Sequence, residues 1–229
     1  MNLIKTTAAV LLLFLLGFSA NAQGTETRTP GAFTSIESGG NWNVYVSIED
    51  RDEVTIESGN IALNKVITEV KDGKLKLKLE KGNYRNVKLD FYVTVRELTG
   101  LGSSGSGSII VEDDVETKKM NLGVSGSGLV QMRNVFAETV NVGISGSGDV
   151  KIEGGETKKL LIGQSGSGDF SGPGLVAEQI NVGKSGSGKS YVGECKSLKV
   201  GASGSGNVYY KGNPELNVGV SGSARVIKQ

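Results

Sequence analysis

One stretch of the sequence matches a catalytic motif letter for letter. Residues 183–190 spell Gly-Lys-Ser-Gly-Ser-Gly-Lys-Ser, which fits the phosphate-binding pattern G-x-x-x-x-G-K-[ST]. That loop binds phosphates because its backbone N–H groups converge at the start of a helix. Here Tyr191-Val192-Gly193 follows, which does not open a helix, and the same glycines recur in sister segments that lack Lys189 and Ser190. We therefore expect no nucleotide binding.

Hydrolytic chemistry is restricted by composition. The chain contains no histidine, which removes Ser-His-Asp and Cys-His triads as well as histidine-based zinc sites. A polysaccharide-active enzyme stays open as an alternative, because a pair of carboxylates suffices for that chemistry. We interpret the carboxylates as solvated turn residues and predict that the protein is not an enzyme. The candidates are Asp113, Asp114, Asp149, Glu153 and Asp169.

Two of these carboxylates occupy the same place in consecutive repeats. Asp149 and Asp169 would stack about 5 Å apart and repel each other unless a cation intervened. Lys189 comes next in the same column, so we favour a salt-bridged ladder. A calcium site at Asp149 and Asp169 is the alternative, and no cofactor is expected.

Aromatic side chains are the other residues that could contact a ligand. Exposed rings stack on the apolar faces of sugars, and few are available here. Our candidates for ligand contacts are Trp42, Tyr191, Tyr209 and Tyr210, with Tyr84 as a further exposed residue.

Most of these residues lie within a repeated sequence motif, which begins at Leu101. An aliphatic residue, a glycine and a variable residue precede Ser-Gly-Ser and then Gly or Ala, seven times. The successive spacings are 21, 20, 20, 20, 18 and 18 residues, and the serines that open the tetrads are Ser104, Ser125, Ser145, Ser165, Ser185, Ser203 and Ser221. A near-constant period predicts stacked units, each too small to bury its own apolar face.

The pattern within each unit predicts strands. Val- and Ile-rich residues recur two apart around each tetrad, and no copy shows a helical stripe. Short turns between units then require parallel pairing of equivalent strands. The sequence predicts an all-β fold, a parallel β-solenoid of about seven rungs of 18–21 residues. Ile162 is expected to face inward and Gln164, in the variable column, to tolerate change. We attribute the repeated glycines to corners at which the backbone needs φ > 0 or approaches a neighbouring backbone closely.

The first 22 residues resemble a secretory signal peptide. Lys5 precedes an apolar run, and Ala20-Asn21-Ala22 forms a small-x-small site, so cleavage is expected before Gln23. No later segment has the apolar length of a membrane span. Without Lys5, the 24 basic and 24 acidic residues balance, which argues against a nucleic-acid partner. Cys195, the only cysteine, is interpreted as a small buried filler.

The segment before the tetrads also shows strand alternation. Trp42-Val44-Val46-Ile48 and residues 87–95 alternate with polar residues, and Asp72-Gly73 predicts a hairpin turn. Residues 61–70 are compatible with a short helix or a loop. We divide the chain into a signal peptide (1–22), a flexible segment (23–30), a β-rich, antiparallel cap (31–100) and the repeat solenoid (101–229).

The signal peptide, the strands such as residues 73–77 and the serial tetrads resemble the auto-transporter adhesin head domain, called the head GIN domain. The resemblance covers residues 31–227. It implies a β-helical fold and an exported adhesin, and it brings no catalytic residues. The resulting hypothesis is a non-catalytic binding or structural module of the cell envelope, in the periplasm, at the cell surface or released. It would present a rigid surface to an unidentified glycan or protein. An envelope scaffold without an adhesive role is the second alternative, beside the enzyme.

Overall fold

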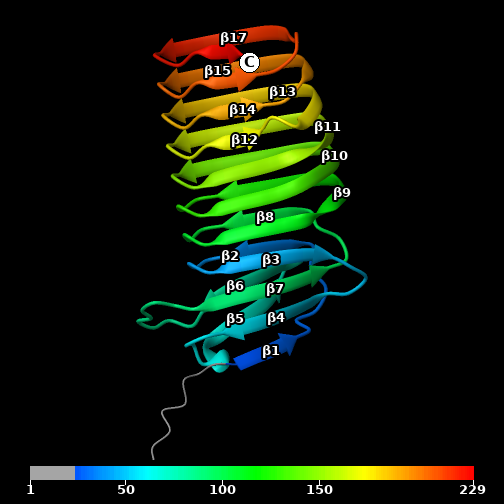
Figure 1. Cartoon of the computed structure of the whole chain (residues 1–229), viewed down its shortest axis with the longest axis vertical. Helices are drawn as coiled ribbons and strands as arrows, with labels where there is room; N and C mark the ends of the chain where they lie inside the picture. Colours follow the sequence, from blue (N-terminus) through cyan, green and yellow to red (C-terminus); the bar gives the residue numbers. More distant parts are fainter. Residues whose placement is uncertain (1–23) are drawn as a thin grey trace, which may run out of the picture.

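The computed structural model describes residues 24–229, which form an all-β solenoid whose strands stack along one long axis (Figure 1). The predicted signal peptide lies outside the described residues. Across this range no helix is both long and apolar enough to cross a membrane. The strands before the repeat are β1 (Gly24–Arg28), β2 (Ser35–Ser38), β3 (Asn43–Ile48), β4 (Glu53–Ser58), β5 (Val66–Lys71), β6 (Lys74–Leu79), β7 (Leu89–Val95) and β8 (Gly100–Ser103).

The repeat forms the upper part of the stack. Its strands are β9 (Ser108–Val124), β10 (Leu129–Gly146), β11 (Asp149–Gly166), β12 (Phe170–Gly172), β13 (Leu175–Gly186), β14 (Ser190–Val192), β15 (Cys195–Gly204), β16 (Val208–Tyr210), β17 (Glu215–Gly222) and β18 (Val226–Lys228). All of their pairings with one another are parallel, and Ser145 stands opposite Ser165, which stands opposite Ser185. The predicted parallel β-solenoid is therefore confirmed.

Alternation along each strand decides which columns form the core. Counting back from the opening serine, the residues at five, three and one places before it point inward, as Val140, Val142 and Ile144 show by their burial. Each buried aliphatic side chain stabilises the fold by about 1.5–3 kcal/mol before entropy is subtracted. The column that we expected to tolerate change is thus internal, and Gln164 is only 6% exposed.

The tetrads form the tight corners of the stack. Gly166 has φ +116°, a conformation that favours glycine. A Cβ on Gly168 would lie 2.0 Å from the carbonyl oxygen of Gly148 in the rung below. Backbone bonds link the corners from rung to rung, for example from Ser167 N to Gly146 O at 2.8 Å. The corners are consequently ordered parts of the solenoid and not flexible linkers.

The N-terminal part continues the stack, but its rungs are out of sequence order. Strand β2 pairs in parallel with β6 on one side and β8 on the other, and β3 lies between β7 and β9 in the same way. The first rung made by the chain is therefore inserted between rungs made later. The N-terminal part is a β-rich cap as expected, but its pairing is mixed and not antiparallel throughout. The antiparallel pairs are β1–β4, β4–β7 and β5–β6.

Strand β1 also differs from expectation, because Gly24–Arg28 is not a flexible segment. It pairs with β4, and Arg28 donates to the carbonyl oxygens of Leu63 and Val66 at 2.8 and 2.7 Å. Leu63–Lys65 forms the 3₁₀ helix η1. The predicted hairpin is confirmed, with Asp72 and Gly73 both at positive φ between β5 and β6.

Cys195 takes the place that the repeat predicted for it. It stands opposite Ala177 in the register, in the column of small residues that includes Thr157. Its side chain is half-buried, and burial raises the pKa of its thiol above the usual value. This environment keeps the thiol protonated, as expected of a packing residue.

Candidate binding groove

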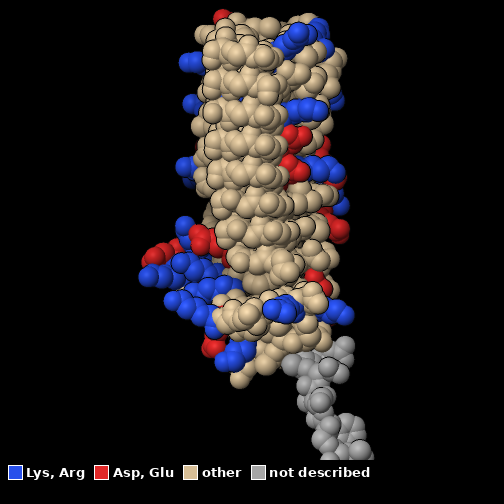
Figure 2. Space-filling model, turned by 90° about the vertical axis from the view of Figure 1, so that its left-hand side faces the viewer, with Lys and Arg blue, Asp and Glu red and all other residues tan. Residues whose placement is uncertain are grey.

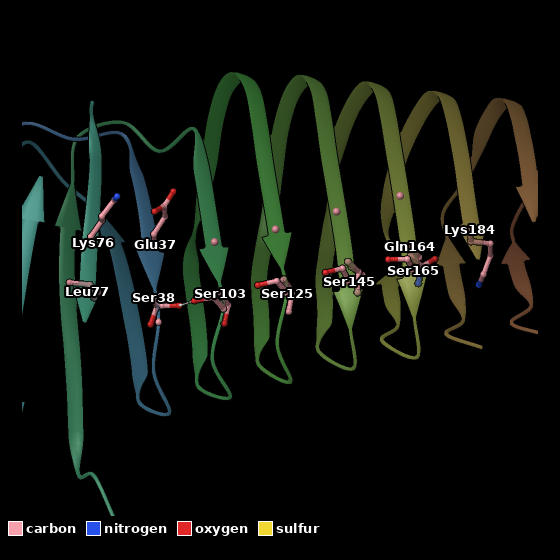
Figure 3. A pocket seen from close by; sticks show the side chains of 18 of the residues that line it. Glu37, Ser38, Lys76, Leu77, Ser103, Ser125, Ser145, Gln164, Ser165 and Lys184 are labelled. Carbon is pink, nitrogen blue, oxygen red and sulfur yellow. Dashed lines mark hydrogen bonds between the residues drawn. The ribbon is translucent and has the colours of Figure 1, made fainter. Parts of the chain in front are cut away.

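A long groove follows the edge of the solenoid where the tetrads begin (Figure 3). It has a volume of about 990 Å³ and reaches from β2 and β6 to the fifth tetrad. Glycines and serines of successive rungs make most of its surface. The residues that define the groove are Glu37–Gly39, Lys76–Lys78, Gly102–Ser104, Gly123–Ser125, Gly143–Ser145, Gly163–Ser165 and Gly183–Ser185.

The glycines two places before the first five tetrads line the groove, and the same column continues beyond it in the last two copies. These glycines lie in strands and have no left-handed φ. A Cβ on Gly123 would meet nothing within 4 Å, and one on Gly163 would meet only Val142 O at 3.9 Å. Glycine inside a strand costs roughly 0.5–1 kcal/mol relative to alanine. Its presence in every copy therefore has no explanation in the packing of the rungs.

Charge is absent from the tetrad edge but present at one end of the groove. The edge shows a continuous strip without Lys, Arg, Asp or Glu over the repeat rungs, with charges at its margins and near the N-terminal strands (Figure 2). At that end the groove is lined by Glu37, Lys76 and Lys78. Glu37 pairs with Lys74 at 3.2 Å, which ties β2 to β6. The surface of the groove is thus mainly apolar, and over the repeat rungs it carries no exposed charged side chain.

A cluster of polar side chains lies beneath the groove, inside the solenoid. Gln164 Nε2 donates to the carbonyl oxygens of Gly168 and Lys189 at 3.0 and 3.1 Å, and Ser190 donates to Gln164 Oε1. One rung later, Lys184 Nζ donates to Gly188 O and, at 3.4 Å, to Asn207 O.

Both long side chains of this cluster are only 6% exposed, and burial lowers the pKa of Lys184, an effect that Asp169 partly opposes. These two side chains satisfy corner carbonyls from within.

The predicted aspartate column has a different role from the one we favoured. Asp149 Oδ1 accepts a hydrogen bond from Asp169 N at 2.8 Å, and Asp169 Oδ1 accepts one from Lys189 N at 2.6 Å. Asn207 repeats the contact with Arg225 N at 3.0 Å. Each side chain thus caps the backbone of the next rung, and a Lys189 ion pair is not what holds them. Over residues 24–229 no three Asp, Glu, Cys or His side chains gather as they would around a metal ion.

The aromatic candidates divide into buried and accessible residues. Trp42 is 5% exposed; its Nε1 donates to Ser38 Oγ at 3.0 Å, and its ring packs on Phe91. It is therefore a core residue, and our assignment of it as a ligand contact is wrong. Tyr191 and Tyr209 stack with their ring centres 4.8 Å apart on the outer face. Tyr84 and Tyr210 are partly buried against the core, and none of these tyrosines lines the groove.

Sequence reasoning missed a second, more exposed pair of tyrosines. Tyr45 on β3 and Tyr92 on β7 stack with ring centres 5.2 Å apart and are 37% and 42% exposed. Burial raises the pKa of Tyr92, and the nearby Glu57 and Asp90 raise it further. The signal was present in the sequence, since both tyrosines alternate with the buried residues of their strands.

The candidate carboxylates do not assemble into one site. Asp113 Oδ2 accepts from Ile48 N at 2.8 Å, and Glu153 lies 3.7 Å from Lys151. Asp114 binds Asn134 and Arg133, and these hydrogen bonds lower its pKa. None of the five lines the groove.

The phosphate-binding motif is likewise part of the repeat. Residues 183–190 run from β13 through a corner to β14, so no helix start is present there to bind phosphate.

Known structures share this fold over almost the whole chain. A structure from Bacteroides fragilis described as a "putative adhesin" has a TM-score of 0.83 and 23% identity, covering 90% of this chain and 97% of its own. A "putative lipid binding protein" from Parabacteroides distasonis has a TM-score of 0.71 and 21% identity, covering 92% and 98%. A "putative adhesin" from Parabacteroides merdae has a TM-score of 0.70 and 16% identity, covering 90% and 96%.

The sequence comparisons give one family and no individual relative. A search among curated proteins finds no match. The family described as "putative auto-transporter adhesin, head GIN domain" matches residues 32–214, most of the described solenoid. With the repeat, the fold and this match in agreement, the chain belongs to that family.

Proposed function

We propose that this protein is an exported, non-catalytic binding module whose groove receives one extended chain. The observation that carries the proposal is the glycine column, which recurs in all seven copies of the repeat although neither φ nor packing requires it. Glycine in a strand is typical of places where a ligand or another backbone approaches closely. The family of adhesins supports a partner outside the cell.

The chemistry of the groove favours an uncharged partner. Serine hydroxyls can donate and accept hydrogen bonds, and they recur at every repeat rung of the groove with no exposed charged side chain between them. A neutral glycan and an extended peptide both meet that requirement, whereas a nucleic acid would need a basic strip. One solved structure of the same fold is described as a lipid binding protein, which makes an acyl chain a third occupant to test.

A binding screen with groove variants tests the proposal. The exported chain would be screened against a glycan array, extended peptides and lipid vesicles, beside a reducing-sugar assay on polysaccharides. Gly163→Val places a side chain in the groove where a Cβ has room. We expect it to weaken binding by about tenfold or more, which is the effect of losing roughly 1.4 kcal/mol, without lowering the melting temperature.

Ser171→Val is the matched control, because Ser171 lies on β12 outside the groove and should leave binding unchanged. Ligand binding that Gly163→Val does not affect would refute the groove as the site. Release of reducing sugars would instead support the carboxylate enzyme. Absence of any ligand would favour an envelope scaffold without an adhesive role. Export after cleavage near Ala22 remains a prediction, to be checked by the mass of the exported chain.

A further inference from the structure

The last rung of the solenoid leaves its apolar interior uncovered. Leu216, Val218 and Val220 continue the three inward columns, yet they are 46%, 45% and 39% exposed. Within the described residues β17 pairs only with β15, so the outer edge of β17 carries free N–H and C=O groups. An exposed edge strand with apolar side chains is a template for pairing with another strand.

The opposite end of the solenoid is closed and charged. There Arg28 on β1 binds Glu26 at 2.8 Å and also donates to the carbonyl oxygens of Leu63 and Val66. An apolar end placed against this end would bury charged groups without new partners. Head-to-tail stacking of two copies is therefore unfavourable, whereas the two apolar ends complement each other.

We propose that two copies of the chain associate tail to tail through β17, about a two-fold axis that passes near Val218. In an antiparallel pair centred there, Val218 faces Val218 of the partner subunit and Leu216 faces Val220 of the partner subunit. Residues directly opposite in such a pair point to the same face of the sheet. The aliphatic columns of both solenoids would then join into one core.

The remaining residues of β17 are compatible with this register. Glu215, the only charged residue of the strand, would face Ser221 of the partner subunit, and Asn217 would face Gly219 of the partner subunit. Like charges therefore do not meet along the strand. At the rim of this end, Lys228 Nζ donates to Asn213 Oδ1 at 2.5 Å. The interface uses the end of the solenoid, so it does not depend on what the groove binds.

Sedimentation velocity of the exported chain over a micromolar concentration range tests the proposal. We expect a dimer, and Val218→Lys should raise the dissociation constant by roughly a hundredfold or more because it places two lysines beside the symmetry axis. Val176→Lys is the control, since Val176 is 44% exposed on β13, away from this end. A monomeric wild-type chain, or a dimer unaffected by Val218→Lys, would overturn the proposal.

A cross-link distinguishes tail-to-tail pairing from other dimers. Val218→Cys on a Cys195→Ala background should form an intermolecular disulfide under mild oxidation, because residue 218 faces its own counterpart. Val176→Cys on the same background should not. Circular dichroism melts of the four variants would show that each remains folded. Equal cross-linking at both positions would contradict the two-fold arrangement.

Discussion

Glycine recurs in three columns of the repeat, and the structure treats the columns differently. The two glycine columns within the tetrads are required by the backbone geometry and by the contacts between rungs. Gly166 has a positive φ, and Gly168 closely approaches Gly148 of the neighbouring rung. The column before the tetrad has ordinary strand geometry and open space around it, as at Gly163. The same residue type therefore serves the packing of the corners in two columns and the shape of the surface in the third.

The last rung supports this distinction. Ala224 replaces the final tetrad glycine there, and within residues 24–229 β17 and β18 each pair on one side only. We infer that the Cβ of Ala224 is tolerated because this corner is held by one neighbouring rung and can shift. Within one repeat, glycines that the packing of the rungs requires can therefore be told apart from glycines that it does not require.

The largest expected effect tests which side of the strand is buried. Ile162→Asp should lower the free energy of unfolding by about 4 kcal/mol or more, because it buries a carboxylate without a partner. Gly163→Asp, one residue along, should change it by less than about 1 kcal/mol, since its side chain would point to solvent. Chemical denaturation of the two variants measures the difference, and equal losses would show that the glycine column is not on the surface.

The second prediction compares alanine in two columns. Gly168→Ala should cost about 3 kcal/mol or more, because its Cβ must displace the backbone of the rung below. Gly163→Ala should be neutral or stabilise by up to about 1 kcal/mol, since a strand glycine is being replaced. Thermal melts of both proteins test this pair. A strongly destabilised Gly163→Ala variant would mean that the groove glycine is structural after all.

A smaller effect concerns the charge beneath the groove. The pKa of Lys184 is lowered from 10.5 by burial, so the unfolded chain binds more protons at pH values between the folded and unfolded pKa. The free energy of unfolding of the wild type, relative to Lys184→Met, should therefore rise as the pH increases through that window. Urea denaturation of both proteins at several alkaline pH values measures the slope. A difference that is flat or falls with pH would contradict burial of the charged amine.

The smallest stability effect is expected for Gly163→Val, the variant that should block the groove. A β-branched residue in an exposed strand position should change the free energy of unfolding by less than about 1 kcal/mol. Differential scanning calorimetry beside the binding assay checks that any loss of affinity comes from the filled groove. A large drop in the melting temperature would show that Gly163 has a role in packing. The loss of affinity would then not demonstrate that the groove is the binding site.

The repeat could be predicted from sequence because its columns are strictly in register. Ser145, Ser165 and Ser185 fall opposite one another as the spacing requires. The inward position of the variable column was missed because Gln164 and Lys184 stand among Val, Ile and Ala. Because Ile162 faces inward, strand alternation also places Gln164 inside. The sequence does not reveal that the Gln164 amide donates hydrogen bonds to carbonyl oxygens at the corners.

The N-terminal rungs were less predictable because their pairing is non-local. Nothing in residues 35–48 indicates that β2 and β3 lie between strands formed about 40 to 65 residues later in the chain, as their registers show. The burial of Trp42 could have been predicted, since Trp42 alternates in step with Val44 and Val46. We gave more weight to the expectation that an aromatic ligand contact is exposed. The groove itself could not be predicted, because glycine is also the expected residue at corners.

The parallel stacking of the rungs has a mechanical consequence. The described N-terminal strand and the C-terminus lie at opposite ends of the long axis (Figure 1), so tension between them acts along the hydrogen bonds that join the rungs. In a single copy, the last rung has a neighbour on one side only within the described residues and would detach first. Each rung released would add 18–21 residues of slack, about 60–75 Å when extended. Under load the solenoid would lengthen in steps while the remaining rungs kept their shape.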